Sequence, residues 1–451
     1  MTIIISDQST AMDSKIKWTL FSLISIVFVL YIYRNVVVLN AEIVLIIIFT
    51  LTVWIIWRRN EPITKAIWVW CCLLLLYWFV TLIATYAHYP PGKRALTILG
   101  VASLVWVFAA LTIALYRLRP NIDFFWGLTL VGGVVALSLG VFDAYELGWF
   151  SSGFFSDRLG SIHSHAVKYA VIVNSMFIIL LGSFSWAYRK HWLFLFFVFC
   201  IVVGLFMISV LSQSRTAWIG WPEALIGWGL YYSYLLKNKF SSASYLNIAS
   251  VAGVITLLVV ITLSLDFLRT PLVERSMKAV SELQAYTSGE NMKGSIGYRL
   301  AGYEVAIEQI PKTFWFGIGE DAFPEFIKSK SSEFALKEFN QKISGFEFSQ
   351  LHNQYLMSFL TKGVFSFISI VLFFVFLVVF FIRHIRRSDG EKKAIAVAGL
   401  VFSISSFLAF MPETPLQNAD TAIHFFLLCS LLIVFTAIEE STGQTEIDIN
   451  D

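Results

Sequence analysis

The chain has 451 residues, of which 57% are hydrophobic, 16% are aromatic and only 14% are charged. An average soluble domain has roughly 45–50% apolar and about 25% charged residues, so this composition excludes a soluble globular protein. The net charge is only +3, from 33 basic and 30 acidic residues, and it gives no reason to expect a nucleic-acid partner. The apolar excess predicts a chain that lies mostly in a lipid bilayer.

Apolar runs of about 20 residues, the length that crosses a bilayer, recur along the chain between short polar breaks. They predict an all-α polytopic membrane protein with about twelve transmembrane helices. The predicted spans are residues 18–33, 36–57, 66–87, 95–116, 124–142, 167–187, 192–211, 216–236, 247–265, 353–382, 395–411 and 421–438.

The spans divide the chain into three parts. Residues 1–265 hold the first nine spans, and residues 266–351 form one long connection that we expect to contain amphipathic helices. Residues 352–451 hold the last three spans and a short acidic tail. Most Lys and Arg residues of the short connections fall on one side, which predicts that both termini are cytoplasmic and that the long loop is periplasmic.

The long loop carries the first candidate helix outside the membrane. Within residues 295–310, Tyr303 and Ile307 lie at helical spacing, and the predicted helix has Ser295 as its N-cap and stops at Pro311. Arg299 lies near its start. Its apolar face is expected to pack down onto the bundle.

A second apolar run in the loop, from Phe323 to Phe339, is interrupted by Lys and Glu residues. It has two interpretations, a helix on the membrane surface or a helix that packs against the rest of the protein. Glu320 and Asp321 precede it and are expected to be solvated charges, because an isolated acidic pair is a weak metal signal. No spacing of Cys and His residues typical of a metal site occurs, and we expect no metal.

Four arginines of the predicted outer face are the candidates for ligand binding: Arg94, Arg158, Arg215 and Arg299. Arg215 stands out, since it lies in the tight turn 212–216, where a basic residue opposes the predicted topology. A lone arginine there would more often be an anchor at the membrane surface. Several guanidinium groups that converge would instead bind a diphosphate, and a lipid-linked diphosphate is the obvious membrane ligand.

His352 is the candidate proton acceptor, because histidine changes its charge near neutral pH. The run 353–382 is longer than a span requires, so the sequence predicts that its helix rises out of the membrane to His352. Eleven residues of helix would place Gly363 on the same face, beneath His352. The alternative is a histidine that only caps this helix.

Three polar residues within the predicted spans, Glu42, Asn174 and Glu223, keep a transporter in consideration. A carboxylate in lipid is costly and is a functional candidate for that reason. A transporter would, however, have polar residues through its spans and a site near the midplane. The other candidates gather at one face, which favours chemistry there.

These residues carry a resemblance to a known family. The turn around Arg215, the segment 295–304 with Arg299, and the pair His352-Asn353 followed by Gly363 are similar to the bacterial O-antigen ligase family. The likeness is concentrated between about residues 205 and 370. One position departs from the family pattern, which has Gly, Thr or Tyr where this chain has Ser366.

The resemblance implies a metal-independent glycosyltransferase of GT-C type in the bacterial inner membrane. It would transfer a glycan from undecaprenyl diphosphate to a sugar hydroxyl of the lipid A-core, at the periplasmic face and with inversion, and would need no nucleotide or other cofactor. Arg215 and Arg299 would clamp the diphosphate, and His352 would act as general base or orient the acceptor. The further residues expected to contact substrate are Arg158, Arg94, Tyr303 and Asn353.

Two other functions remain open from the sequence. An O-antigen polymerase belongs to the same superfamily and would use another lipid-linked chain as acceptor. A transporter or flippase of lipid-linked sugars would bind similar molecules without catalysing a reaction. A protein O-oligosaccharyltransferase is less attractive, because we find no added domain for a protein acceptor.

Overall fold

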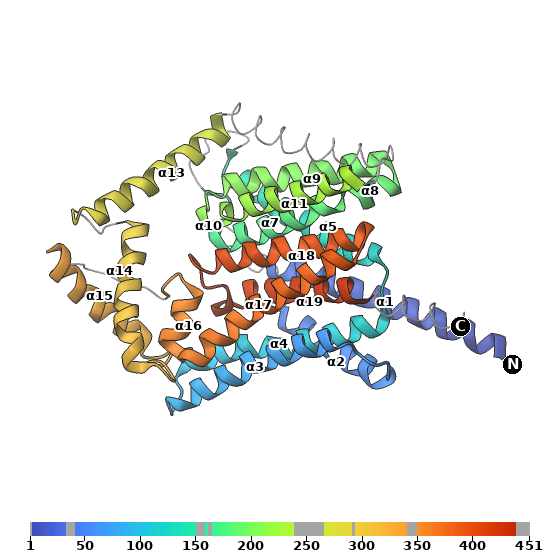
Figure 1. Cartoon of the computed structure of the whole chain (residues 1–451), viewed down its shortest axis with the longest axis horizontal. Coiled ribbons are helices and arrows are strands. Elements are labelled where there is room, and N and C mark those ends of the chain that lie inside the picture. Colours follow the sequence, from blue (N-terminus) through green and yellow to red (C-terminus); the bar gives the residue numbers. More distant parts are fainter. Residues whose placement is uncertain are drawn as a thin grey trace.

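The computed structural model describes residues 2–32, 41–149, 158–160, 165–238, 266–290, 294–340 and 350–438. These residues form helices and turns, with no β-strand among them, in agreement with the predicted all-α fold. The helices build one elongated bundle, and α13, α14 and α15 project from one end of it (Figure 1). The predicted span 247–265 and the acidic tail after residue 438 lie outside the described residues.

Eight helical segments of the described chain are long and apolar enough to cross a membrane. Each segment is rich in Leu, Ile, Val and Phe side chains. Because each segment is helical, its backbone N–H and C=O groups bond to one another, as a bilayer without water requires. They are α3 (Lys65–Ala87), α4 (Lys93–Leu118), α5 (Ile122–Glu146), α7 to α8 (Ala166–Lys190), α9 (Trp192–Leu211), α17 (Val364–Arg387), α18 (Gly390–Ala409) and α19 (Ala419–Ala437).

Three further predicted spans fall on helices of the structure. Residues 18–33 overlap α1 (Thr2–Ile32), and residues 36–57 overlap α2 (Ala41–Arg58). Residues 216–236 correspond to the short α10 (Arg215–Trp218) and to α11 (Gly220–Asn238). The figure of twelve spans and the sidedness of the bundle stay predictions.

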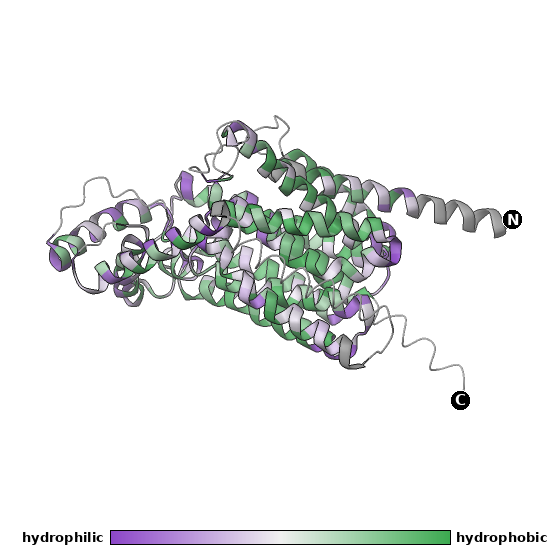
Figure 2. Ribbon diagram, turned by 90° about the horizontal axis from the view of Figure 1, so that it is seen from above, coloured by the Kyte–Doolittle hydropathy of each residue, from purple (hydrophilic) through white to green (hydrophobic). Residues whose placement is uncertain are grey.

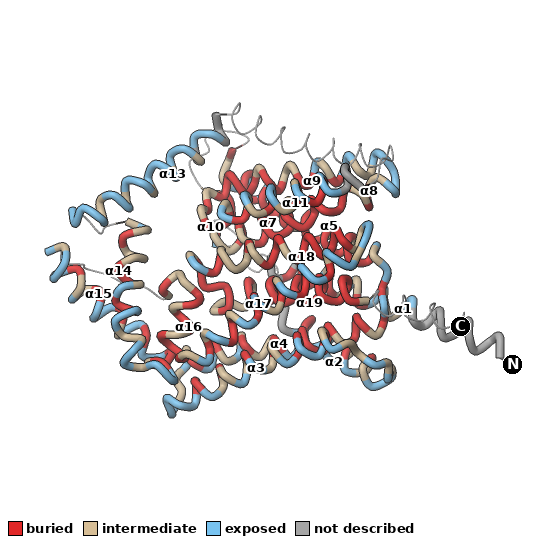
Figure 3. Tube along the Cα trace, viewed as in Figure 1, coloured by how far each residue is buried: buried red, intermediate tan, exposed pale blue. Residues whose placement is uncertain are grey.

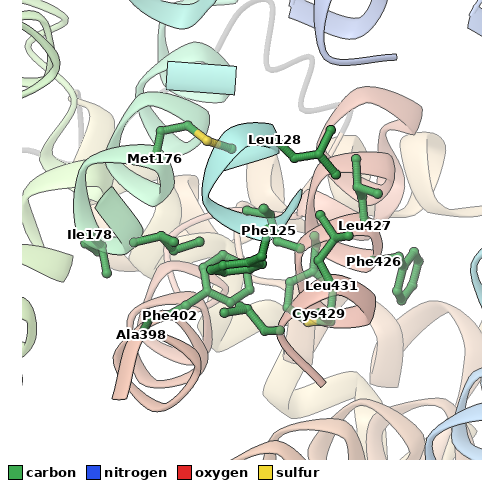
Figure 4. Packing of buried hydrophobic residues seen from close by; sticks show 14 of the residues in the cluster. Phe125, Leu128, Met176, Ile178, Ala398, Phe402, Phe426, Leu427, Cys429 and Leu431 are labelled. Carbon is green, nitrogen blue, oxygen red and sulfur yellow. The ribbon is translucent and has the colours of Figure 1, made fainter. Parts of the chain in front are cut away.

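The centre of the bundle is α19. Its side chains from Thr421 to Ala437 are all buried, and α4, α5, α7 and α18 pack around it (Figure 3). Figure 4 shows Phe426 of α19 in the same apolar cluster as Phe125 of α5 and Phe402 of α18. The bundle is mostly hydrophobic along its length, and hydrophilic residues gather in the projecting helices and at the opposite end of the bundle (Figure 2).

The tenth predicted span is not one continuous helix, and this prediction was wrong. The structure has α16 (Gln354–Lys362) and then α17, with Gly363 between them at φ +79° and ψ −176°. Such a backbone conformation is essentially restricted to glycine. The Phe314 carbonyl oxygen accepts the Val364 N–H at 2.9 Å, and this bond holds the chain in a turn. Gly363 therefore lies in a bend, and not on the face of a continuous helix beneath His352.

The projecting helices are α13 (Asp266–Thr287), α14 (Ser295–Gln309) and α15 (Phe323–Phe339). The predicted N-cap Ser295 was wrong by one position. Gly294 precedes the helix, and the Glu282 carboxylate accepts the Ile296 N–H at 3.2 Å. The stop is as predicted, because the helix tightens to a 3₁₀ turn at Pro311.

Helix α15 packs against the protein, which supports the second interpretation of this run. Its residues Phe323 and Ile327 are fully buried in a cluster with Val305 and Ala306 of α14 and Leu360 of α16. The outer helices therefore form a small second core of their own. This core sits on the end of the bundle near α16 (Figure 1).

Candidate functional site

Arg215 is positioned by the turn between α9 and α10. Helix α9 ends at Leu211, and Gln213 adopts a left-handed conformation at φ +52° that reverses the chain. Arg215 then opens α10, with its Nη2 3.8 Å from Oε2 of Glu282 on α13. This ion pair joins the turn to the projecting helices.

Arg158 lies against the same turn. Its Nε donates a hydrogen bond to the Ser212 carbonyl oxygen at 3.0 Å, and the neighbouring Leu159 N–H bonds the Leu211 carbonyl at 3.3 Å. Burial lowers the pKa of the Arg158 guanidinium, and the positive charges of Arg275 and Arg215 lower it further. Arg158 and Arg215 thus share one electropositive region, as predicted from the sequence.

Arg275 is a member of this group that the sequence analysis missed. It lies on α13, and its Nε donates to Oε1 of Gln213 at 3.0 Å. Burial lowers the pKa of Arg215, and both Arg299 and Arg275 contribute to the shift. No sequence signal separated Arg275 from the other basic residues of the long loop, because only the docking of α13 on the turn brings it in.

Arg299 and His352 meet at one carboxylate. Nη2 of Arg299 lies 3.4 Å from Oε1 of Glu413, and Nδ1 of His352 lies 3.4 Å from Oε2. This region has two carboxylates, Glu282 and Glu413, and a formal surplus of two positive charges. The positive charges come from four arginines: Arg158, Arg215, Arg275 and Arg299. Such a surplus suits a diphosphate.

Glu413 is the second residue that the sequence analysis missed. It lies in the connection between α18 and α19, between Pro412 and Pro415, and is 9% exposed. A buried carboxylate is costly unless it is paired, and here Arg299 supplies a charge and His352 a ring nitrogen. The sequence did contain a signal for Glu413, since it is a glutamate flanked by two prolines in a short connection between two predicted spans.

His352 itself is held by its neighbours. It adopts φ +52°, and the Tyr303 hydroxyl donates to its carbonyl oxygen at 2.8 Å and to that of Met411 at 3.3 Å. Burial raises the pKa of Tyr303 to about 12, so the phenol keeps its proton. Asn353 caps α16 by accepting the Leu356 N–H at 3.0 Å. Tyr303 and Asn353 therefore fix the position of His352.

Arg94 lies in a different group of charges. Its Nε is 3.5 Å from Oε2 of Glu320, and its guanidinium lies over the ring of Phe323. Glu320 is 4% exposed and also lies 3.7 Å from the fully buried Lys362 ammonium. The prediction of a solvated charge was wrong for Glu320, which is buried, whereas Asp321 is exposed and accepts the backbone N–H of Gly92 at 2.7 Å, just before α4.

The polar residues of the bundle do not join this site. Both Glu223 carboxylate oxygens are buried without a hydrogen-bond partner in the described part of the protein, and Asn174 is buried near Gly220. The side chain of Glu42 lies outside what the structure describes. Within the described ranges, no group of three or more His, Cys, Asp and Glu side chains is arranged to hold a metal ion.

Comparison with known proteins gives two findings. Residues 205–371 match the family model described as O-antigen ligase. An uncharacterized protein of Haemophilus influenzae is 26% identical over 284 residues, which are 61% of this chain and 64% of that protein, just under two thirds of its length. The family segment contains Arg215, Arg275, Arg299 and His352. The resemblance of this chain to the O-antigen ligase family is therefore confirmed, over the segment that builds most of the site.

Proposed function

We propose that this protein is an O-antigen ligase. It transfers a glycan from undecaprenyl diphosphate to a sugar hydroxyl of the lipid A-core at the periplasmic face of the inner membrane. The observation that carries the proposal is the Glu413 carboxylate, which touches both Arg299 and His352. Arg299, which can bind an anion, and His352, the candidate base, are thus separated only by the Glu413 side chain. A transfer from a diphosphate donor needs two such groups close together.

The proposed reaction gives each of these residues a role. Arg215 and Arg299, with Arg158 and Arg275, bind the diphosphate and stabilise the charge that develops on it as it leaves. His352 takes the proton of the acceptor hydroxyl, whose oxygen attacks the anomeric carbon from the side opposite the diphosphate. The new glycosidic bond forms as the carbon–oxygen bond to the diphosphate breaks, which inverts the anomeric carbon.

Glu413 has a defined part in this mechanism. With Nδ1–H of His352 directed at its carboxylate, the lone pair of the ring lies on Nε2, where a base needs it. The carboxylate also stabilises the imidazolium that forms when the proton is taken. Glu413 acts through His352 and Arg299 and is a positioning residue.

The direct test uses purified protein in lipid nanodiscs with a lipid-linked glycan and rough lipopolysaccharide, without nucleotide and with EDTA. We expect transfer by the wild type, none by Arg215→Ala, and a rate reduced by roughly 10²–10⁴-fold for His352→Ala. Arg269→Ala is the matched control, because Arg269 is an exposed arginine of α13. Full activity of both site variants would contradict the proposal, and loss of transfer in EDTA would contradict metal independence.

A deletion strain separates the ligase from a polymerase with the same site chemistry. Loss of a ligase leaves polymerised O-antigen on its lipid carrier and an unsubstituted core. Loss of a polymerase leaves single repeats attached to the core, and this result would reject the ligase. A flippase would give no transfer at all with purified components.

A further inference from the structure

A cavity of about 250 Å³ adjoins the site and has Glu413 among its lining residues. Its wall comes from three segments that are distant in the sequence: the start of α7, the residue two before His352, and the connection from α18 into α19. The lining residues are His165, Val167, Lys168, Val171, Gln350, Glu413, Thr414, Pro415, Asn418 and Thr421.

The wall of this cavity is held by internal hydrogen bonds. The Thr414 hydroxyl donates to Oε1 of Gln350, and the Thr421 hydroxyl donates to the Pro415 carbonyl oxygen at 2.6 Å. The Asn418 amide reaches the Thr414 carbonyl oxygen at 3.4 Å. A ligand would therefore meet a preformed polar surface, which lowers the entropy lost on binding.

The lining has the chemistry of a sugar site. Hydroxyl, amide and carboxylate groups can exchange hydrogen bonds with sugar hydroxyls, and the apolar side chains of Val167, Val171 and Pro415 can face a sugar ring. The volume is below the roughly 300–1,000 Å³ of pockets for drug-sized ligands, so it suits one sugar ring. Among the described residues that line it there is no arginine, which sets it apart from the diphosphate region.

Lys168 is the cation of the cavity. Burial lowers the pKa of the neighbouring His165, and the charge of Lys168 lowers it further, whereas the Glu413 carboxylate opposes this shift. The His165 side chain makes no capping hydrogen bond to α7. The lining thus brings a lysine and a histidine side chain together with the Glu413 carboxylate, and the lysine is the group with the charge to attract an anionic substituent.

We infer that this cavity binds the acceptor sugar and that Lys168 and His165 select an acceptor with an anionic substituent, a phosphate or a carboxylate. The inference rests on the proposed function. It places the acceptor and not the donor here, since the arginines take the diphosphate and the cavity shares Glu413 with the proposed base His352. A charge-assisted hydrogen bond from Lys168 would then set acceptor affinity.

The test compares Lys168→Gln and Lys168→Arg with the wild type, using rough lipopolysaccharide as acceptor and a fixed lipid-linked donor. We expect Lys168→Gln to raise the acceptor KM about tenfold, the usual worth of a hydrogen bond to a charged group, with kcat and donor KM unchanged. Lys168→Arg retains the charge and should restore most of the affinity. His165→Ala should raise the acceptor KM by a smaller factor.

Two modified acceptors identify the anionic group. If it is a phosphate, phosphatase treatment of the acceptor should abolish the difference between the wild type and Lys168→Gln. If it is a carboxylate, chemical reduction of the acceptor carboxyl groups should do so. A difference that persists with both acceptors, a change in donor KM alone, or no change in any constant would overturn the inference.

A binding measurement with the acceptor alone, in the absence of donor, tests this inference separately from the proposed function. Rough lipopolysaccharide should bind the wild type about tenfold more tightly than Lys168→Gln, whether or not transfer occurs. Lys328→Gln is the matched control, because Lys328 is an exposed lysine of α15. Equal binding by Lys168→Gln and the wild type would reject the acceptor site even if the wild type transfers glycan, and absence of transfer by the wild type would reject the function alone.

Discussion

Nδ1 of His352 lies 3.4 Å from Oε2 of Glu413, although 61 residues separate them in the chain. The other carboxylate oxygen of Glu413 lies 3.4 Å from Nη2 of Arg299. One buried carboxylate thereby joins a residue that enters α16, a residue of the projecting helix α14 and the connection between the last two helices. Its removal should take a hydrogen-bond partner from the candidate base and release Arg299 from a competing carboxylate.

Replacing this carboxylate should slow the transfer step. Glu413→Gln should lower kcat tenfold or more, but by less than His352→Ala, because base catalysis contributes about 10²–10⁴-fold and the base itself remains. Donor KM should not rise, since Arg299 loses a competing carboxylate. Glu413→Asp, which keeps the charge, should retain more activity. An unchanged kcat for Glu413→Gln would show that the carboxylate does not act on His352.

Arg275 should contribute to donor binding. Arg275→Gln should raise donor KM about tenfold, the worth of a hydrogen bond to a charged group, with a smaller effect on kcat. Arg275→Lys should recover part of the loss, because an ammonium keeps the charge but not the forked donors. Arg269→Gln on the same helix serves as control. A donor KM equal to that of the wild type would remove Arg275 from the site.

The Tyr303 hydroxyl should stabilise the region of His352 in a pH-dependent way. Tyr303→Phe removes the single hydroxyl donor that the His352 and Met411 carbonyl oxygens share, and should lower the Tm. Because the folded-state pKa of about 12 lies above the ordinary value of 10, this stabilisation is present below pH 10 and is lost as the pH rises toward 12. The difference in Tm between wild type and variant should therefore be constant from pH 7 to 9 and shrink above pH 10. A constant difference across the whole range would contradict it.

The bend at Gly363 should not tolerate a side chain. A Cβ atom there would lie 1.9 Å from the Trp315 carbonyl oxygen, and the backbone conformation alone costs of order 1–3 kcal/mol for another residue. Gly363→Ala should lower the Tm strongly and reduce folded protein. Gly100→Ala is the control, since nothing lies within 4 Å of its Cβ position in α4, and it should be neutral or stabilising. Equal stability of both variants would contradict the observed bend.

The buried charges around Glu320 should be strongly coupled. Glu320→Gln leaves the Lys362 ammonium without its carboxylate in a buried position and should cost about 3–5 kcal/mol of unfolding free energy. Lys362→Met in the same chain removes the unpaired charge and should recover part of this loss. Unfolding of the two single variants and the double variant gives the coupling energy. Additive losses would show that the two groups do not interact.

The helices and part of the site could be predicted from the sequence. Apolar runs near 20 residues form helices in a bilayer because no water is present to bond the backbone, and this local rule identified α3 to α5, α9, α18 and α19. Arg215 and Arg299 could be singled out as charges that the topology did not require. The structure places both in one electropositive region.

Tertiary contacts decided the rest. Arg94 has the same side chain as Arg215, yet it lies against Glu320, while Arg275 reaches Gln213 only because α13 docks on the turn after α9. Gly363 looked like a residue of a long helix, but the Phe314 carbonyl oxygen fixes a bend there. Apolar length is a local property that the sequence alone determines. The partner of each charge depends on how distant segments pack, and only the folded structure decides it.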